Sequence, residues 1–120
     1  MKRGKARCTD PTPEQRAEVI DRAKMRCERC GTYLGYAAYS IHHRLPRGRG
    51  GRNELSNLVL LCGSATSPDT CHAFVESRRE QAYDEGWLVR SEMDPAEVPV
   101  AHVAFGRVLL DNDGGYAEAA

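Results

Sequence analysis

The fold is decided by residues 27–72, which read CERCGTYLGYAAYSIHHRLPRGRGGRNELSNLVLLCGSATSPDTCH. Four cysteines lie near the ends of this stretch, with a spacing of C-x2-C, then 31 residues, then C-x8-C. Two thiolates two residues apart bind one tetrahedral Zn²⁺ from a single turn, and a second pair from a distant segment completes the ligand set. The spacing predicts a structural zinc site made by Cys27, Cys30, Cys62 and Cys71. The alternative is four buried or free thiols.

Three histidines and an asparagine accompany the cysteine pairs: His42, His43, Asn57 and His72. Consecutive residues of a strand point to opposite faces, so His42 and His43 cannot both bind one metal from a regular strand. Hydrolysis of a phosphodiester needs a water nucleophile, a base and a cation, and the two histidines suit a split into one metal ligand and one base. The alternative for each histidine is an ordinary hydrogen-bonded side chain.

The order CxxC, His-His, Pro, Gly-Gly, NLxxLC and Cys-His resembles the HNH endonuclease family, over residues 27 to about 85. The resemblance implies a β-hairpin followed by a helix around one catalytic metal ion. We therefore expect an α+β fold, a small zinc-clamped ββα-metal domain with an N-terminal helix and short C-terminal strands. Within the family, the chain looks most like small phage-type HNH proteins, some of which work with the DNA packaging terminase.

The same resemblance implies a role for each matching residue. His43 is expected to be the general base that activates water, and His42 and His72 are expected to bind the catalytic metal. Asn57 is expected to restrain the loop that carries His43. Glu76 follows His72 by four residues on the same helix face, so it is a further candidate ligand, either directly or through water; the alternative is a surface carboxylate.

The choice of catalytic metal depends on His42, which stands where many relatives have an aspartate. A site with two histidines is softer than one with a carboxylate, which favours transition metals over Mg²⁺. The expected cofactors are therefore one structural Zn²⁺ and one divalent catalytic ion, from Mn²⁺, Ni²⁺, Co²⁺, Mg²⁺ or Zn²⁺.

The net charge of zero conceals two halves of opposite charge. Residues 1–60 carry 13 Lys+Arg against 6 Asp+Glu, a balance of +7, and residues 61–120 carry 4 against 11, a balance of −7. The arginines around the expected hairpin loop are candidates for phosphate contacts with DNA. They are Arg44, Arg47, Arg49 and Arg52. The alternative is a solvated loop.

The length of 120 residues favours a single domain. We expect a flexible basic arm over residues 1–11, one HNH nuclease domain over 12–110 with its core at 27–86, and a flexible tail over 111–120. Thr12 and Gln15 predict a capping box for a helix that runs to about residue 26. A second helix is expected over residues 71–85, ended by Gly86.

Strands are expected over residues 40–44, 58–62, 87–89 and 106–110. The sequence has no apolar run of about 18 residues that would span a membrane, and its first residues lack the apolar core of a secretion signal. These features favour a cytoplasmic location, which is the host cytoplasm if the chain is phage-encoded.

The expected function is a metal-dependent DNA endonuclease that nicks or cuts by phosphodiester hydrolysis, with DNA as partner. A non-catalytic zinc-ribbon module that binds DNA or protein is the alternative, and it would need the cysteines but not His42, His43 or Asn57. A packaging accessory that docks to a terminase is a further alternative.

Overall fold

The computed structural model describes residues 10–64 and 66–119, which form two antiparallel sheets and three helices. The helices are α1 (Pro13–Ala23), α2 (Cys71–Ser77) and α3 (Arg79–Glu85). The first sheet pairs β1 (Tyr39–His43) with β2 (Leu58–Cys62), and the second has the order β3 (Val100–His102), β4 (Gly106–Leu110), β5 (Tyr116–Glu118). Short 3₁₀ turns lie at Arg47–Arg49, Leu55–Asn57 and Pro95–Glu97. The expected α+β fold class is confirmed.

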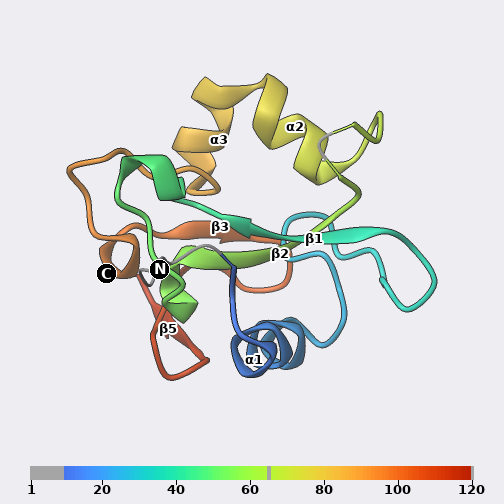
Figure 1. The fold of residues 1–120 in the computed structure, drawn as a ribbon, viewed down its shortest axis with the longest axis horizontal. Helices are drawn as coiled ribbons and strands as arrows, with labels where there is room; N and C mark the ends of the chain where they lie inside the picture. Colours follow the sequence, from blue (N-terminus) through green and yellow to red (C-terminus); the bar gives the residue numbers. More distant parts are fainter. Residues whose placement is uncertain (1–9, 65, 120) are drawn as a thin grey trace, which may run out of the picture.

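The β1–β2 hairpin lies between the helices (Figure 1), with α2 and α3 on one side and α1 on the other. Leu58, Val59, Leu60 and Leu61 are all fully buried. Because β2 is covered on both faces, it is a continuous apolar run and does not alternate. The expected strand over residues 58–62 is confirmed, and β1 begins and ends one residue before its expected bounds.

Helix α1 begins with the predicted capping box. The Gln15 backbone N–H donates to Thr12 Oγ1 at 3.1 Å, and the Thr12 backbone N–H donates to Gln15 Oε1 at 2.8 Å. The helix ends at Ala23, earlier than residue 26, because Lys24 adopts a left-handed conformation with φ of 57°. None of the helices in the described residues is long and apolar enough to cross a membrane.

Two expectations for residues 71–89 are wrong. The single helix is split at Arg78, whose φ of −115° and ψ of 63° are not helical. Residues 87–89 form no strand, because the Trp87 and Leu88 N–H groups bond back to the Ala82 carbonyl at the end of α3. Gly86 ends α3 as predicted, and a Cβ there would lie only 1.9 Å from the Pro99 carbonyl oxygen.

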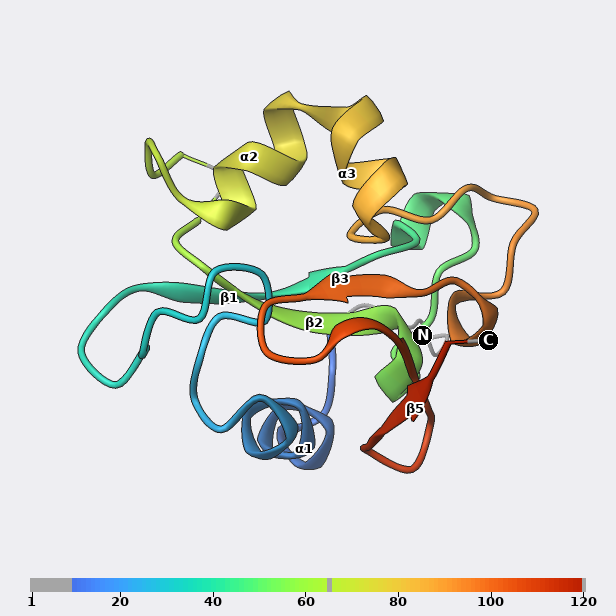
Figure 2. The ribbon, with the colours of Figure 1, turned by 180° about the vertical axis from the view of Figure 1, so that it is seen from behind.

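The C-terminal strands extend further than expected, because β5 lies inside the segment predicted to be a flexible tail. Asp111 makes the turn before β5, since its Oδ1 atom accepts from the N–H groups of Asp113 and Gly115 at 2.9 and 2.8 Å. Figure 2 shows β3 in front of β2 when the molecule is viewed from behind. Residues 1–9 of the expected basic arm lie outside the described residues.

Candidate functional site

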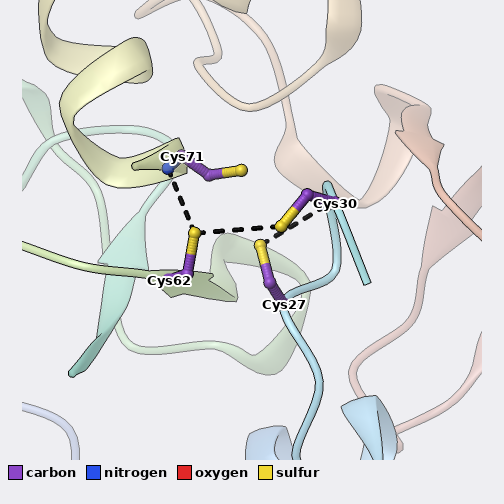
Figure 3. A group of neighbouring side chains, drawn as sticks. All are labelled: Cys27, Cys30, Cys62 and Cys71. Carbon is purple, nitrogen blue, oxygen red and sulfur yellow. Dashed lines mark hydrogen bonds between the residues drawn. The ribbon is translucent and has the colours of Figure 1, made fainter. Parts of the chain in front are cut away.

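The four cysteines form one cluster (Figure 3) in which their sulfur atoms approach one another from separate segments. Cys27 and Cys30 follow α1, Cys62 ends β2, and Cys71 begins α2. Their Sγ atoms all lie within 4.8 Å of one another. A tetrahedron with Zn–S bonds of about 2.3 Å has edges of about 3.8 Å, and Cys30 Sγ lies 3.8 Å from Cys62 Sγ. The cluster fits a structural zinc ion.

The electrostatics of the cluster also favour a cation. A hydrogen bond from Cys71 lowers the pKa of Cys27 to about 5, and the same bond, with burial, raises the pKa of Cys71. Burial is the main cause that raises the pKa of Cys62. The protein alone therefore favours one thiolate at the expense of its neighbours, and a divalent cation would supply the charge needed to ionise all four.

A buried carboxylate anchors the CxxC turn to the rest of the fold. Glu28 is 1% exposed and lies between the two first cysteines. Its carboxylate accepts from Arg22 Nη2 at 2.8 Å, from the Leu60 backbone N–H at 2.9 Å and from the Tyr116 hydroxyl. This network was not predicted from the sequence, because Leu60 and Tyr116 lie 32 and 88 positions after Glu28.

A second group of ligating side chains consists of His42 on β1 and His72 and Glu76 on α2, with ligand atoms within 4.8 Å of one another. His42 Nε2 lies 3.0 Å from the Trp87 carbonyl oxygen. A carbonyl can only accept, so Nε2 carries the proton and Nδ1 keeps a lone pair for a metal. Burial, with a smaller effect from His72, lowers the pKa of His42 to about 3, so this imidazole is neutral at physiological pH.

His72 and Glu76 complete this group. Burial lowers the pKa of His72, opposed by Glu76, whose Oε2 lies 3.8 Å from His72 Nε2. The buried Nδ1 atom of His72 has no hydrogen-bond partner among the described residues. Two neutral imidazoles and one carboxylate form a donor set suited to a divalent transition metal.

His43 is not part of the ligand group, as the alternation along a strand predicts. Its Nε2 lies 2.6 Å from Asn53 Oδ1. His43 nevertheless borders the same hollow, of about 600 Å³, as the three candidate ligands. The polar and charged side chains that line this hollow are His42, His43, Arg47, His72, Glu76 and Arg79.

Asn57 holds the long loop between β1 and β2. This side chain is fully buried, and its Oδ1 accepts from the Leu45 N–H at 2.7 Å. Its Nδ2 donates to the carbonyls of Leu45 and Arg52 at 3.1 and 2.8 Å. Gly51 fits the same loop because a Cβ there would lie 1.7 Å from the Leu45 carbonyl oxygen. Asn57 therefore ties the two arms of the loop together directly after His43.

Comparison with protein families gives a match to the HNH endonuclease over residues 27–64. Residues 27–64 are similar to an HNH motif. The match includes three of the cysteines, both β1 histidines and Asn57, and it ends before His72 and Glu76, which the fold brings to the same hollow. The matched model describes an endonuclease, and the match covers about a third of the chain. Comparisons with curated proteins and with solved structures found no match.

The structure corrects the expectation for Arg44, which lies in the HNH motif and was a candidate for contact with DNA phosphates. It is fully buried, and its guanidinium donates to the carbonyls of Ser56, Gly86, Pro95 and Val98 at 2.6–2.9 Å. Burial, with a smaller effect from Arg22, lowers its pKa to about 9. The expectation that Arg44 contacts DNA is wrong, because its donors bind the protein's own C-terminal segment to the HNH motif.

The other three loop arginines, Arg47, Arg49 and Arg52, are exposed, and Arg47 Nη1 lies 3.5 Å from Asp10 Oδ1. Arg79 also lines the hollow, and its Nη1 lies 3.9 Å from Glu76 Oε1. This residue was not predicted from the sequence. Its spacing from His72 and Glu76, at one helical face, is the signal that could have found it.

Proposed function

We propose that the protein is a metal-dependent DNA endonuclease that nicks or cuts DNA by hydrolysing phosphodiester bonds. The observation that carries this proposal is the hollow in which His43 adjoins the group of His42, His72 and Glu76. A divalent cation held by that group would supply positive charge against the charge that builds on the phosphate. His43 takes a proton from water at Nδ1, because its Nε2 is already bonded to Asn53.

Exposed arginines border this hollow and would hold the DNA backbone. Arg47 and Arg79 line it, and Arg49 and Arg52 lie on the adjoining loop. The guanidinium fork matches phosphate oxygens, which carry no sequence information. We therefore propose weak sequence preference.

The test is cleavage of a supercoiled plasmid with Mn²⁺, Ni²⁺, Co²⁺ or Mg²⁺, and with EDTA. His43→Ala should lower the cleavage rate by about 10²–10⁴-fold, the usual range for a lost general base. Zinc content, folding and DNA affinity should stay nearly intact. The matched control is His102→Gln, a histidine outside the hollow whose Nε2 bonds to the Tyr116 hydroxyl. Cleavage by His43→Ala at the wild-type rate would contradict the proposal.

The alternative is a non-catalytic zinc module, because the cysteine cluster would stabilise the fold without the histidine hollow. DNA binding without cleavage, with every cation tested, would favour this alternative. Cooperation with a packaging terminase stays a prediction, and cleavage that requires a partner protein would favour it.

A further inference from the structure

We propose that Asn53 is a positioning residue that determines which ring nitrogen of His43 is free to accept a proton. This inference rests on the proposed function. Asn53 is 8% exposed, in the loop between β1 and β2. Its Oδ1 atom lies 2.6 Å from His43 Nε2, a short hydrogen bond between two side chains.

The orientation of the Asn53 amide is fixed from its other end. Asn53 Nδ2 donates to the backbone carbonyl of Asp10 at 3.0 Å. Because that carbonyl can only accept, the NH₂ group must face Asp10 and the amide oxygen must face His43. An amide oxygen also only accepts, so His43 Nε2 must carry the proton, and the lone pair of neutral His43 lies on Nδ1.

This chain of bonds brings a segment outside the HNH match into the site. Asp10 precedes α1 and lies 17 positions before the matched residues begin at 27. Asn57 restrains the same loop, but its bonds go to backbone atoms of Leu45 and Arg52. Asn53 is therefore the residue of the loop that acts on the imidazole itself. In the opposite tautomer, Nδ1 would present a proton to water and could not accept one.

The direct test is the tautomer of His43, measured by ¹⁵N NMR in the zinc-loaded protein without DNA or a second metal. At about pH 8, where an ordinary histidine is neutral, the wild type should show His43 with its proton on Nε2. Asn53→Ala should give a mixture of tautomers. Asn53→Asp should keep the proton on Nε2, because a carboxylate oxygen also accepts. The matched control is Asn112→Ala. The Asn112 side chain accepts a hydrogen bond from the N–H of Ser56, which lies in the same loop as Asn53, and its loss does not affect the bond to His43.

Cleavage under single-turnover conditions gives the second readout. Asn53→Ala should lower the rate at saturating enzyme by about tenfold or more, but less than His43→Ala, and leave the enzyme concentration that gives the half-maximal rate unchanged. Asn112→Ala should cut at the wild-type rate. A folded Asn53→Ala protein that keeps His43 wholly in the Nε2–H form would overturn the inference. The tautomer is measured without cleavage. Failure of the proposed nuclease activity would be recognised separately, because the wild type would then fail to cleave DNA with every cation tested.

Discussion

The cysteine cluster and the histidine hollow both contain a candidate ligand set, but the two sets are built from different donors. The cysteines come from three separate segments, and their sulfur atoms accept hydrogen bonds from the Cys30 and Cys71 backbone N–H groups and from the Arg29 guanidinium. The histidines are already held by the protein, since His42 bonds to the Trp87 carbonyl and His43 bonds to Asn53. The first set needs a cation for its four thiols to ionise together, whereas the second set offers neutral imidazoles and a carboxylate.

The difference supports the proposal that the two sites hold metals with different roles. Four protein ligands close the shell of a structural zinc ion, whereas three leave a position for water or substrate. The four cysteines connect the turn after α1 to β2 and α2. The group of His42, His72 and Glu76 lies in a hollow bordered by exposed arginines. Loss of the first metal should therefore cost folding, and loss of the second should cost activity alone.

The largest expected effect is the removal of a cluster cysteine. Cys27→Ala or Cys62→Ala should abolish cooperative unfolding, because binding of structural zinc is worth about 10–16 kcal/mol in small zinc domains. Elemental analysis should give about one Zn²⁺ per wild-type chain. Cys8→Ala, which removes the fifth cysteine, should keep the zinc and serves as the control. A native-like wild type without bound zinc would contradict the assignment of the four cysteines as a structural zinc site.

A smaller effect is expected from the buried neutral His42. Its pKa is lowered to about 3 in the fold, so below about pH 6.5 the unfolded chain binds a proton that the folded chain does not. Stability should therefore fall as the pH falls. Relative to His42→Gln, whose amide can still donate to Trp87, the wild type should lose about 2 kcal/mol between pH 7.5 and 5.

This comparison is made by denaturant unfolding with zinc bound and no second metal. The variant controls for loss of zinc at low pH, since it has the same cysteines. An equal pH dependence in both proteins would show that His42 is not held neutral.

The choice of catalytic metal should follow the chemistry of His42. Wild-type cleavage should proceed with Mn²⁺, Ni²⁺ or Co²⁺ at least as well as with Mg²⁺, and His42→Asp should shift the preference toward Mg²⁺ by about tenfold. The variant loses the bond donated to the Trp87 carbonyl, at a cost of about 1–3 kcal/mol, so rates are compared at a temperature where both proteins are folded. A wild type that strongly prefers Mg²⁺, with no change in the variant, would refute this assignment.

The smallest effect is expected at the rim of the hollow. Replacing Arg47 and Arg49 by Ala should weaken DNA binding and reduce its salt dependence by about one unit of slope per lost phosphate contact. The matched pair is Arg79→Ala and Arg78→Ala, because Arg79 lines the hollow and its neighbour does not. An unchanged slope in all these variants would place the DNA elsewhere.

Local signals in the sequence predicted much of the fold and most of the candidate site. The capping box of Thr12 and the apolar run of β2 each specify structure within a few residues, and the cysteine spacing predicts a shared site across a gap of 31 residues; all three have the predicted form. The break at Arg78 could not be predicted in this way, because no glycine or proline marks it. The Asp-Gly-Gly turn before β5 was a signal that the prediction of a flexible tail overlooked.

Two residues with distant partners were also misjudged from the sequence. Arg44 looked like a phosphate contact because it follows two histidines, but its carbonyl partners lie up to 54 positions downstream. Asn53 was missed because its role depends on Asp10, which lies 43 positions away. In both cases the chemistry of the side chain was visible, and only the fold supplied the partner.

The most direct test of the account is a Mn²⁺ titration of zinc-loaded wild type and His72→Ala, with calorimetry and plasmid cleavage measured on the same samples. The wild type should bind about one further ion per chain beyond zinc, and its cleavage should rise with that binding. His72→Ala should keep its zinc and its fold but lose both the second ion and the cleavage. Cleavage by the wild type without a second ion, or full cleavage by His72→Ala, would contradict the assignment of the histidine hollow as the catalytic metal site.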